Sequence, residues 1–328
     1  MKKVFKILLW ILAVFVLGIA GLLSYLKFGL PNVGDAPDLT IKITPGRLER
    51  GEYLSWYVSG CIECHSKRDW TTFSGPVIPG TEGGGGDAFT REMGLPGNYY
   101  PPNITPAALE DWTDGEIFRA MTSGVDRDGK ALFPLMPYHY IGRMDREDVN
   151  SIIAYIRTLE PVESRMPESE SDFPINFIIN LMPEKPEFTT LPDTSDHVAY
   201  GHYMANAGGC IHCHTTQDDR GMIMEDMWFA GGNEYLIPTT GDIVRSANLT
   251  PDEKTGIGRW SEDAFVARMT AFADSSAHLP KARPGYFNTV MSWSLHGKMH
   301  ESDLRDIYQY LRTIKPISHE VVRFTPKN

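Results

Sequence analysis

The sequence predicts a mostly α-helical protein in which one domain occurs twice behind an apolar N-terminal helix. Short motifs recur in the same order in the two halves of the chain, which indicates a duplication. Helical periodicity recurs with them, and no segment shows sustained strand alternation. At 328 residues the chain has room for two domains and a leading helix.

The apolar N-terminus is predicted to be a membrane anchor over residues 1–30. Three lysines within the first six residues precede the uncharged stretch Ile7–Leu26, which is about the 20 residues needed to cross a bilayer core. Lysines in front of a span predict a single pass through the inner (cytoplasmic) membrane, with the rest of the chain in the periplasm. The alternative is a signal peptide cleaved at Gly18-Ile-Ala20. Because the apolar run continues past Ala20, we favour a retained anchor.

The clearest repeat is a five-residue motif, since Cys61-Ile-Glu-Cys64-His65 recurs as Cys210-Ile-His-Cys213-His214. Other paired positions keep the same order in both halves. They are Asn103-Ile-Thr-Pro106 with Asn248-Leu-Thr-Pro251, Trp112 with Trp260, Met136 with Met291, Met144 with Met299, Asp148 with Asp303, and Pro161 with Pro316. We therefore predict domain 1 over residues 45–163, a linker over 164–193 and domain 2 over 194–320.

Helices are expected at corresponding places in the two copies. Each copy closes with a helix that is apolar on one face, acidic in its first turn and ended by a proline. Helices around Arg47–Ser59 and Asp196–Ala207 are expected to lead into the cysteine motifs, and another follows each repeated tryptophan. Within the linker, Phe173–Met182 is apolar. It predicts either a membrane-contacting patch or packing between domains, and we favour packing because the stretch is too short to span.

The C-x-x-C-H motif is the attachment signal for haem c. Its two thiols form thioethers to the porphyrin, and the adjacent histidine coordinates the iron. We therefore predict two covalently attached haems. The cofactor-binding residues are Cys61, Cys64, Cys210 and Cys213, and the iron ligands are His65 and His214. A redox dithiol needs neither the histidine nor a second copy, and a Cys₄ zinc site needs its cysteine pairs close in sequence.

Methionine is the expected second iron ligand, because a thioether raises the potential of an electron-transfer haem. Met136 and Met291 occupy one repeat position in loops before the closing helices, whereas methionine as core filler is more usual on an apolar helix face. Met144 and Met299 are interpreted as core. His139, His296 and His300 are the fallback ligands.

Several other residues receive structural interpretations. The run Gly83–Gly86 lacks the residues of a phosphate loop and is expected to be a turn beside the haem. Asn103 and Asn248 are expected to orient backbone or a haem propionate by hydrogen bonding. The repeated tryptophans, Trp112 and Trp260, should lie in the core, packed against haem or a helix. The remaining histidines outside the motifs, His197, His202, His278 and His319, are interpreted as surface or structural.

The acidic balance of the chain excludes one class of partner. A formal net charge of −11 is opposite to the basic surface that nucleic acid requires. It favours docking against a basic protein surface instead.

With these motifs assembled, the region from about Gly51 to Pro316 resembles the membrane-bound cytochrome c subunits of periplasmic alcohol, aldehyde and gluconate dehydrogenases. The resemblance implies class I cytochrome c folds, His/Met ligation and passage of electrons from a dehydrogenase toward quinone or a terminal oxidase. Two features depart from the family. The better-known members carry three haems rather than two, and Met291 is followed by Ser292-Trp293 where the first copy and the family have Pro-Tyr.

We expect an electron carrier or electron-transfer subunit with no catalytic residues of its own, because an iron with six ligands has no position for substrate. The expected partners are redox proteins: a membrane or periplasmic dehydrogenase or quinol-oxidising complex on one side, and a terminal oxidase or soluble cytochrome on the other. The alternative is a di-haem enzyme, of a peroxidase or thiosulfate-oxidising type, with one open or weakly ligated haem. The changed residues after Met291 are the feature that favours it.

Overall fold

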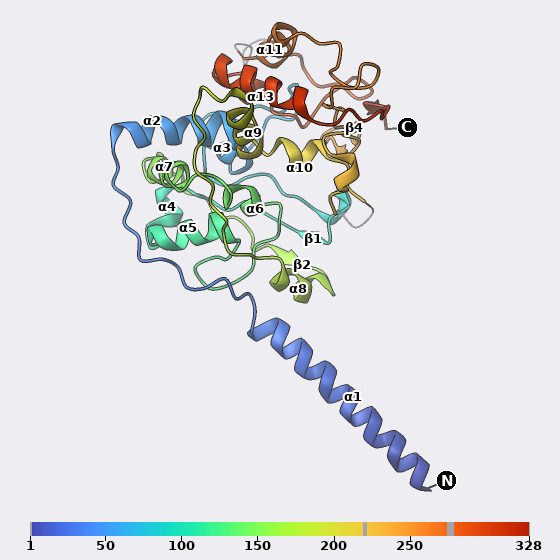
Figure 1. The fold of residues 1–328 in the computed structure, drawn as a ribbon. Coiled ribbons are helices and arrows are strands. Elements are labelled where there is room, and N and C mark those ends of the chain that lie inside the picture. Colours follow the sequence, from blue (N-terminus) through green and yellow to red (C-terminus); the bar gives the residue numbers. More distant parts are fainter. Residues whose placement is uncertain (1, 219–221, 274–278, 328) are drawn as a thin grey trace.

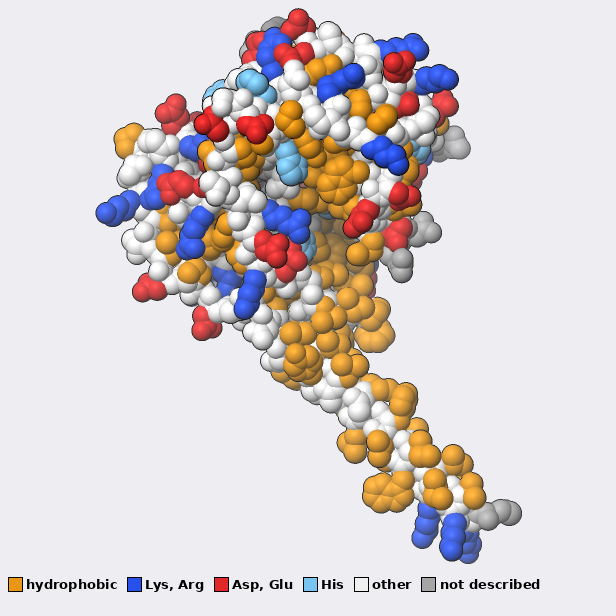
Figure 2. Space-filling model, in the orientation of Figure 1, with side chains coloured by type: hydrophobic (Ala, Val, Ile, Leu, Met, Phe, Trp, Pro, Cys, Tyr) orange, Lys and Arg blue, Asp and Glu red, His pale blue; other side chains and the backbone are white. Residues whose placement is uncertain are grey.

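The N-terminal helix α1 (Lys2–Phe28) projects from the rest of the protein as a single rod (Figure 1). The computed structural model describes residues 2–218, 222–273 and 279–327. Within those residues α1 is the helix long and apolar enough to cross a membrane, and none of it is buried by the protein. Figure 2 shows its apolar side chains running from the basic tip to the body. The helix continues without a break through Gly18-Ile-Ala20.

The body is mostly helical, as predicted, and its helices recur in pairs. In the first half, α2 (Pro45–Tyr53) and the π-helical turn η1 (Leu54–Val58) lead to α3 (Cys61–Cys64), and α7 (Arg146–Ile156) packs across α2. In the second half, α9 (His197–Ala207) leads to α10 (Cys210–His214), and α13 (Glu301–Thr313) packs across α9.

Both helix crossings depend on glycine. A Cβ atom on Gly51 would lie 1.9 Å from the backbone oxygen of Ser151 in α7, and one on Gly201 would lie 1.8 Å from that of Asp306 in α13. No side chain can fit in such a gap, so only glycine lets the two backbones approach this closely. The crossings bring the first and last helices of each half together around one apolar core.

The π-helical turn η1 reflects a difference in length between the copies. Ten positions separate Gly51 from Cys61, whereas nine separate Gly201 from Cys210. A single extra residue inside a helix is accommodated as a π-bulge. The bulge therefore lets the first copy reach its cysteine motif from an equivalent helix crossing.

Further helices follow in each half. The helices expected after the tryptophans are α5 (Asp114–Ser123), with a complete capping box at Thr113, and α11 (Glu262–Thr270), capped by Ser261. The short helices are α4 (Pro106–Leu109), α6 (Tyr138–Ile141), α12 (Trp293–His296), η2 (Arg91–Met93) and η4 (Glu225–Met227).

Short antiparallel strands, which the sequence did not predict, fasten the loops. Strand β1 (Gly97–Asn98) pairs with β2 (Glu170–Ser171). Strands β3 (Glu234–Leu236), β4 (Ile243–Arg245) and β5 (Phe324–Thr325) form a second sheet in that order.

The apolar linker segment lies beside α1 rather than between the two halves, which contradicts the favoured interpretation. It forms α8 (Ile175–Ile178) and η3 (Ile179–Leu181), and both contact the end of α1. The amide of Asn180 donates to the backbone oxygen of Leu26 at 2.9 Å. Phe173 and Leu181 are 76% and 58% exposed. The segment is therefore placed for contact with whatever surrounds the end of α1.

We predict that Gly51→Ala lowers the free energy of unfolding by about 1–3 kcal/mol, because its methyl group overpacks the crossing with α7. Gly46 is the matched control, since it lies in the same helix and a Cβ there meets no atom within 4 Å. Gly46→Ala should leave stability unchanged or slightly higher. Denaturant unfolding of the purified protein measures both, and equal effects of the two variants would contradict the crossing.

Candidate haem centres

The two motif histidines make the same hydrogen bond in both halves. The Nδ1 atom of His65 donates to the backbone oxygen of Pro102 at 2.7 Å, and that of His214 donates to the oxygen of Ala247 at 2.8 Å. With Nδ1 carrying the proton, Nε2 holds the free lone pair. Metal-bound histidines are usually oriented by a contact of this kind.

Both histidines are in the protonation state that an iron ligand requires. Burial lowers the pKa of His65, against the hydrogen bond to Pro102, which raises it. Burial lowers the pKa of His214 to about 4, with the hydrogen bond to Ala247 again opposing. The rings are therefore neutral at pH 7, and neutral imidazole is the form that binds metal.

The four cysteines are free thiols suited to covalent attachment rather than to redox exchange. None of them forms a disulfide. Burial raises the pKa of Cys61 and of Cys210 to about 12, whereas redox dithiols have lowered values. No group of three or more His, Cys, Asp or Glu among the described residues is placed to hold a metal ion. The residues present fit thioether-linked haem.

The loops that supply the carbonyl groups are held by the repeated asparagines. Asn103 accepts from the backbone of Thr105 at 2.8 Å and donates to the oxygen of Val162 at 2.7 Å. Asn248 makes the equivalent bonds to Thr250 at 2.9 Å and to the oxygen of Ile317 at 2.8 Å. The prediction that they orient backbone is confirmed. Each ties its loop to the segment after the closing helix.

The glycine loops lie against the motifs, as expected for Gly83–Gly86. The N–H of Gly85 donates to the backbone oxygen of His65 at 2.8 Å, and that of Gly231 donates to the oxygen of His214 at 2.6 Å. A Cβ on Gly86 would lie 1.9 Å from the oxygen of Cys64. Glycine is therefore required where the loop passes the first motif.

Met136 and Met291 occupy equivalent turns. The N–H of Tyr138 donates to the oxygen of Met136, and that of Trp293 to the oxygen of Met291, both at 2.8 Å. Each turn leads into a short helix, α6 or α12. The methionine side chains are half-buried, and their ligation remains a prediction. Met144 and Met299 are buried in the core, as predicted.

The chain is similar in sequence to several known proteins. No protein-family profile matches the chain. Over 289 residues it is 28% identical to the cytochrome c subunit of a quinone-dependent alcohol dehydrogenase from Gluconacetobacter polyoxogenes, covering 82% of this chain and 56% of the relative. It is 26% identical to the gluconate 2-dehydrogenase cytochrome c subunit of Pantoea cypripedii, covering 81% and 59%.

This chain is a homologue of these cytochrome c subunits. The resemblance seen in the sequence is thereby confirmed. The chain spans just over half the length of both dehydrogenase subunits. A relative from Cereibacter sphaeroides named as a dihaem c-type cytochrome is 26% identical and is matched over 83% of its length, with 72% of this chain covered.

The other histidines of this cytochrome homologue have protein partners. Of the fallback ligands, His139 lies 2.7 Å from a carboxylate oxygen of Glu184, His296 bonds the oxygen of Tyr57 at 2.8 Å, and the ring of His300 stacks on Tyr53. The remaining histidines are structural or at the surface, as predicted. His197 bonds Asp306, His319 bonds the oxygen of Ala230 and exposed His202 packs beside Tyr310, while His278 lies outside the described residues.

The two repeated tryptophans differ. Trp112 is partly buried against the core, as predicted. Trp260 is 39% exposed, so it does not lie in the protein core, and its packing against the haem stays a prediction. Its backbone oxygen accepts from the hydroxyl of Tyr308 at 2.6 Å, and its backbone N–H donates to the oxygen of Ile257 at 2.9 Å.

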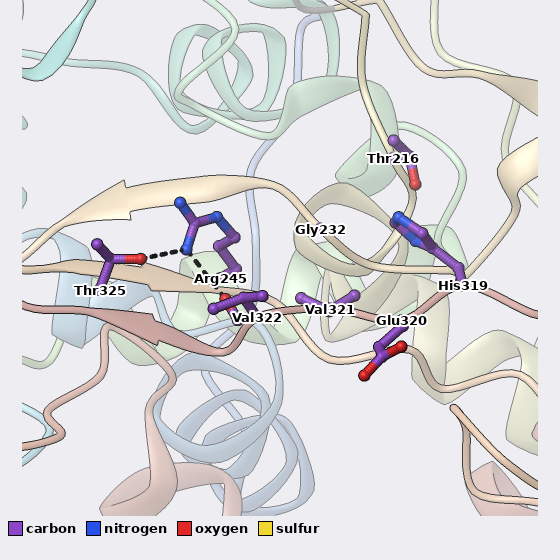
Figure 3. A pocket seen from close by; sticks show the side chains of 8 residues that line it. All are labelled: Thr216, Gly232, Arg245, His319, Glu320, Val321, Val322 and Thr325. Atoms are coloured by element: carbon purple, nitrogen blue, oxygen red, sulfur yellow. Dashed lines mark hydrogen bonds between the residues drawn. The ribbon is translucent and has the colours of Figure 1, made fainter.

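A surface pocket of about 520 Å³ opens beside the second motif (Figure 3). Its lining includes Thr216, Gly232, Arg245 and His319. None of the cysteines or predicted iron ligands lines it, so we assign it no part in haem binding.

The interface between the halves is built on a reciprocal pair of buried hydrogen bonds that the sequence did not reveal. The hydroxyl of Tyr53 in α2 donates to Asp303 in α13 at 2.5 Å, and that of Tyr203 in α9 donates to Asp148 in α7 at 2.6 Å. Burial raises the pKa of both tyrosines and the facing carboxylate adds to the rise, so both remain donors. Each half thus anchors the closing helix of the other.

This interface brings the two motifs close together. Burial raises the pKa of Cys64 to about 11, and the nearby Glu63 carboxylate and the Cys213 thiol add to the rise. Cys64 keeps a solvent-exposed side, so the rise reflects dense protein on its other sides. The segments that lead into the two motifs lie in contact, because a Cβ on Gly208 would lie 3.6 Å from the backbone oxygen of Val58. This contact places the two attachment sites as neighbours.

We predict that Tyr53→Phe lowers the free energy of unfolding by about 1–3 kcal/mol, because it leaves a buried carboxylate short of a donor. Tyr203→Phe should cost less. Asp148 keeps the bidentate guanidinium of Arg50 at 2.7 and 2.8 Å, whereas among the described residues Asp303 keeps only the Ser302 hydroxyl. Chemical denaturation of both variants measures the difference. A larger loss in Tyr203→Phe would contradict this account of the interface.

Proposed function

We propose that the chain is a di-haem cytochrome c that transfers electrons and has no substrate chemistry of its own. One haem is attached to Cys61 and Cys64 and the other to Cys210 and Cys213. The observation that carries the proposal is the duplicated contact in which His65 and His214 donate from Nδ1 to a loop carbonyl and keep Nε2 free. Each motif then has two thiols and one neutral imidazole, which is the donor set of haem c.

The haems, when bound, supply a reversible one-electron centre. The chain holds and orients them: the carbonyl groups of Pro102 and Ala247 fix the imidazole planes, and the asparagine-tied loops keep those carbonyl groups in place. We assign Met136 and Met291 as the second ligands, because a thioether favours reduced iron. With His65, Met136, His214 and Met291 as ligands, the chain would fill the ligand positions of both irons and leave no open position for substrate.

We propose a dehydrogenase or quinol-oxidising complex as electron donor and a terminal oxidase or soluble cytochrome as acceptor. The proposal is supported by the relatives, which are named as cytochrome c subunits of alcohol and gluconate dehydrogenases. The net charge of −11 favours a partner that presents a basic surface.

We propose that α1 is retained as a single-pass anchor in the inner membrane, with the body in the periplasm. The last turn of α1 is tied to the body by Asn180 and by the ammonium of Lys27, which lies 5.9 Å from the ring centroid of Phe177. Because Leu26 and Lys27 lie after Ala20, these contacts fix the end of α1 that meets the body. Retention is supported by the apolar run, which continues past Ala20 to Leu26. The exposed Phe173 and Leu181 would then meet the bilayer interface, where apolar side chains are stabilised.

Intact-mass measurement of the protein purified from membranes tests the anchor. We expect a mass that includes the segment up to Phe28 together with two haems. A chain that begins just after Ala20 would contradict retention and favour the signal peptide.

Replacing Met136 and Met291 one at a time by alanine tests the ligands. Each variant should lose about half of the far-red methionine–iron absorption band and gain carbon monoxide binding at one haem, because each removes one of two thioether ligands. Absorption spectra of the oxidised and of the carbon monoxide-treated reduced protein report both. An unchanged band in Met291→Ala would leave the second haem with another ligand or none, and would favour the enzyme hypothesis.

A further inference from the structure

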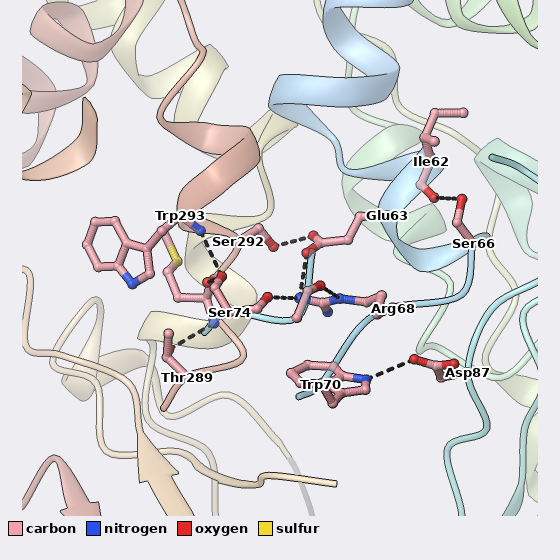
Figure 4. Close-up of polar contacts among 12 residues, drawn as sticks. Ile62, Glu63, Ser66, Arg68, Trp70, Ser74, Asp87, Thr289, Ser292 and Trp293 are labelled. Atoms are coloured by element: carbon pink, nitrogen blue, oxygen red, sulfur yellow. Dashed lines mark hydrogen bonds and ion pairs between the residues drawn. The ribbon is translucent and has the colours of Figure 1, made fainter. Parts of the chain in front are cut away.

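The turn that holds Met291 is fastened by residues of the other half of the chain. The hydroxyl of Ser74 donates to the backbone oxygen of Met291 and accepts from the N–H of Trp293 at 3.3 Å (Figure 4). Its own N–H donates to the side chain of Asn288 at 2.9 Å. One buried serine of the first half thus contacts the turn on both sides of Ser292.

The segment that carries Ser74 is itself docked on the second half. The N–H of Phe73 donates to the oxygen of Pro280, and the N–H of Ala282 donates to the oxygen of Thr71, both at 2.8 Å. Ser74 is fully buried and has a φ of 65°, in the left-handed region that non-glycine residues rarely adopt. Such a conformation persists where the surroundings determine it.

A buried ion pair links this serine to the first cysteine motif. Glu63, between Cys61 and Cys64, lies 2.6 Å from the guanidinium of Arg68, and their side chains are only 8% and 13% exposed. Arg68 also donates to the backbone oxygens of Ser74 and Gly75, both at 2.6 Å. The same Glu63 carboxylate accepts from the hydroxyl of Ser292, the residue after Met291 (Figure 4).

These contacts account for the sequence difference between the two methionine turns. In the first copy Met136 is followed by Pro137, whose ring fixes its own φ. The second copy has Ser292 at this position. Serine does not restrict its own φ, but its hydroxyl donates a hydrogen bond to the Glu63 carboxylate. The Met136 turn is made rigid by its own proline, whereas the Met291 turn is held by residues from the other half of the chain.

We propose that Glu63, Arg68, Ser74 and Ser292 form a positioning cluster that holds Met291 against the second iron. The proposal rests on the assignment of Met291 as a ligand. Glu63 lies inside the first attachment motif, so the cluster makes methionine ligation at one haem depend on the docked structure around the other. Removing one partner leaves a buried charge or hydroxyl unpaired, and the turn loosens.

The test uses full-length holoprotein with Ser292→Ala, Glu63→Gln and Ser74→Gly. Each should weaken the methionine–iron band by up to half and lower the reduction potential of one haem while the other keeps its value. Ser292→Thr keeps the hydroxyl and should keep the band. Ser294→Ala is the matched control, because Ser294 lies in α12, which begins directly after Ser292, and is buried as deeply, at 6% against 9% exposure. It should leave band and potentials unchanged.

The outcomes separate this inference from the proposed function. If Met291→Ala halves the band but Ser292→Ala and Ser74→Gly leave band and potentials as in the wild type, the positioning cluster is refuted and the ligand stands. If Met291→Ala itself leaves the band intact, the ligand assignment and the inference fall together. Equal loss of the band in Ser294→Ala and Ser292→Ala would also refute the cluster. Ser74→Gly keeps the left-handed backbone available, so it reports the hydroxyl even if Glu63→Gln does not fold.

Discussion

The close crossing of the first and last helix in each half is the constraint on which the rest depends. Helix α2 continues into the first cysteine motif, and α7 follows the Met136 turn, so the crossing at Gly51 sets where both sides of the first site begin. Gly201 does the same for α9, α13 and the second site. The histidine–carbonyl bonds and the asparagine-tied loops are built on these frames, and the π-helical turn corrects for the extra residue in the first copy. The same helix crossing occurs in both halves, and it gives the two sites equivalent geometry.

The interface joins the two crossed helix pairs into one body. Tyr53 and Tyr203 each donate to the closing helix of the other half, which fixes the halves in a reciprocal arrangement with the cysteine motifs as neighbours. The two halves nevertheless differ where they meet. Glu63 reaches the second methionine turn, whereas His212, its counterpart in the second motif, lies edge-on to Tyr140 near the first. The duplication therefore supplies the symmetry, and substitutions at the interface give each site its own surroundings.

Much of the site could be predicted because its signals are local. The C-x-x-C-H motifs, the repeated asparagines and the closing helices are each contained in a few residues, and their order recurs. The contacts between Glu63 and Ser292 join positions 229 residues apart, and no local pattern indicates such a pairing. The sequence did show that Pro-Tyr is replaced by Ser-Trp after Met291, but the contacts that explain this replacement come from the first half of the chain. The apolar linker segment was misjudged because a stretch too short to span the membrane was expected to pack between the domains, whereas α8 packs on the projecting helix α1.

If both haems bind as proposed, the interface would hold them as neighbours that exchange electrons directly. Pulse reduction of the oxidised full-length protein, with less than one electron delivered per molecule, tests it most directly. The account predicts a first-order redistribution of the electron between the two haems, with a rate that does not change when the protein is diluted. A rate that falls in proportion to protein concentration, or an electron that stays on one haem with no redistribution, would contradict it.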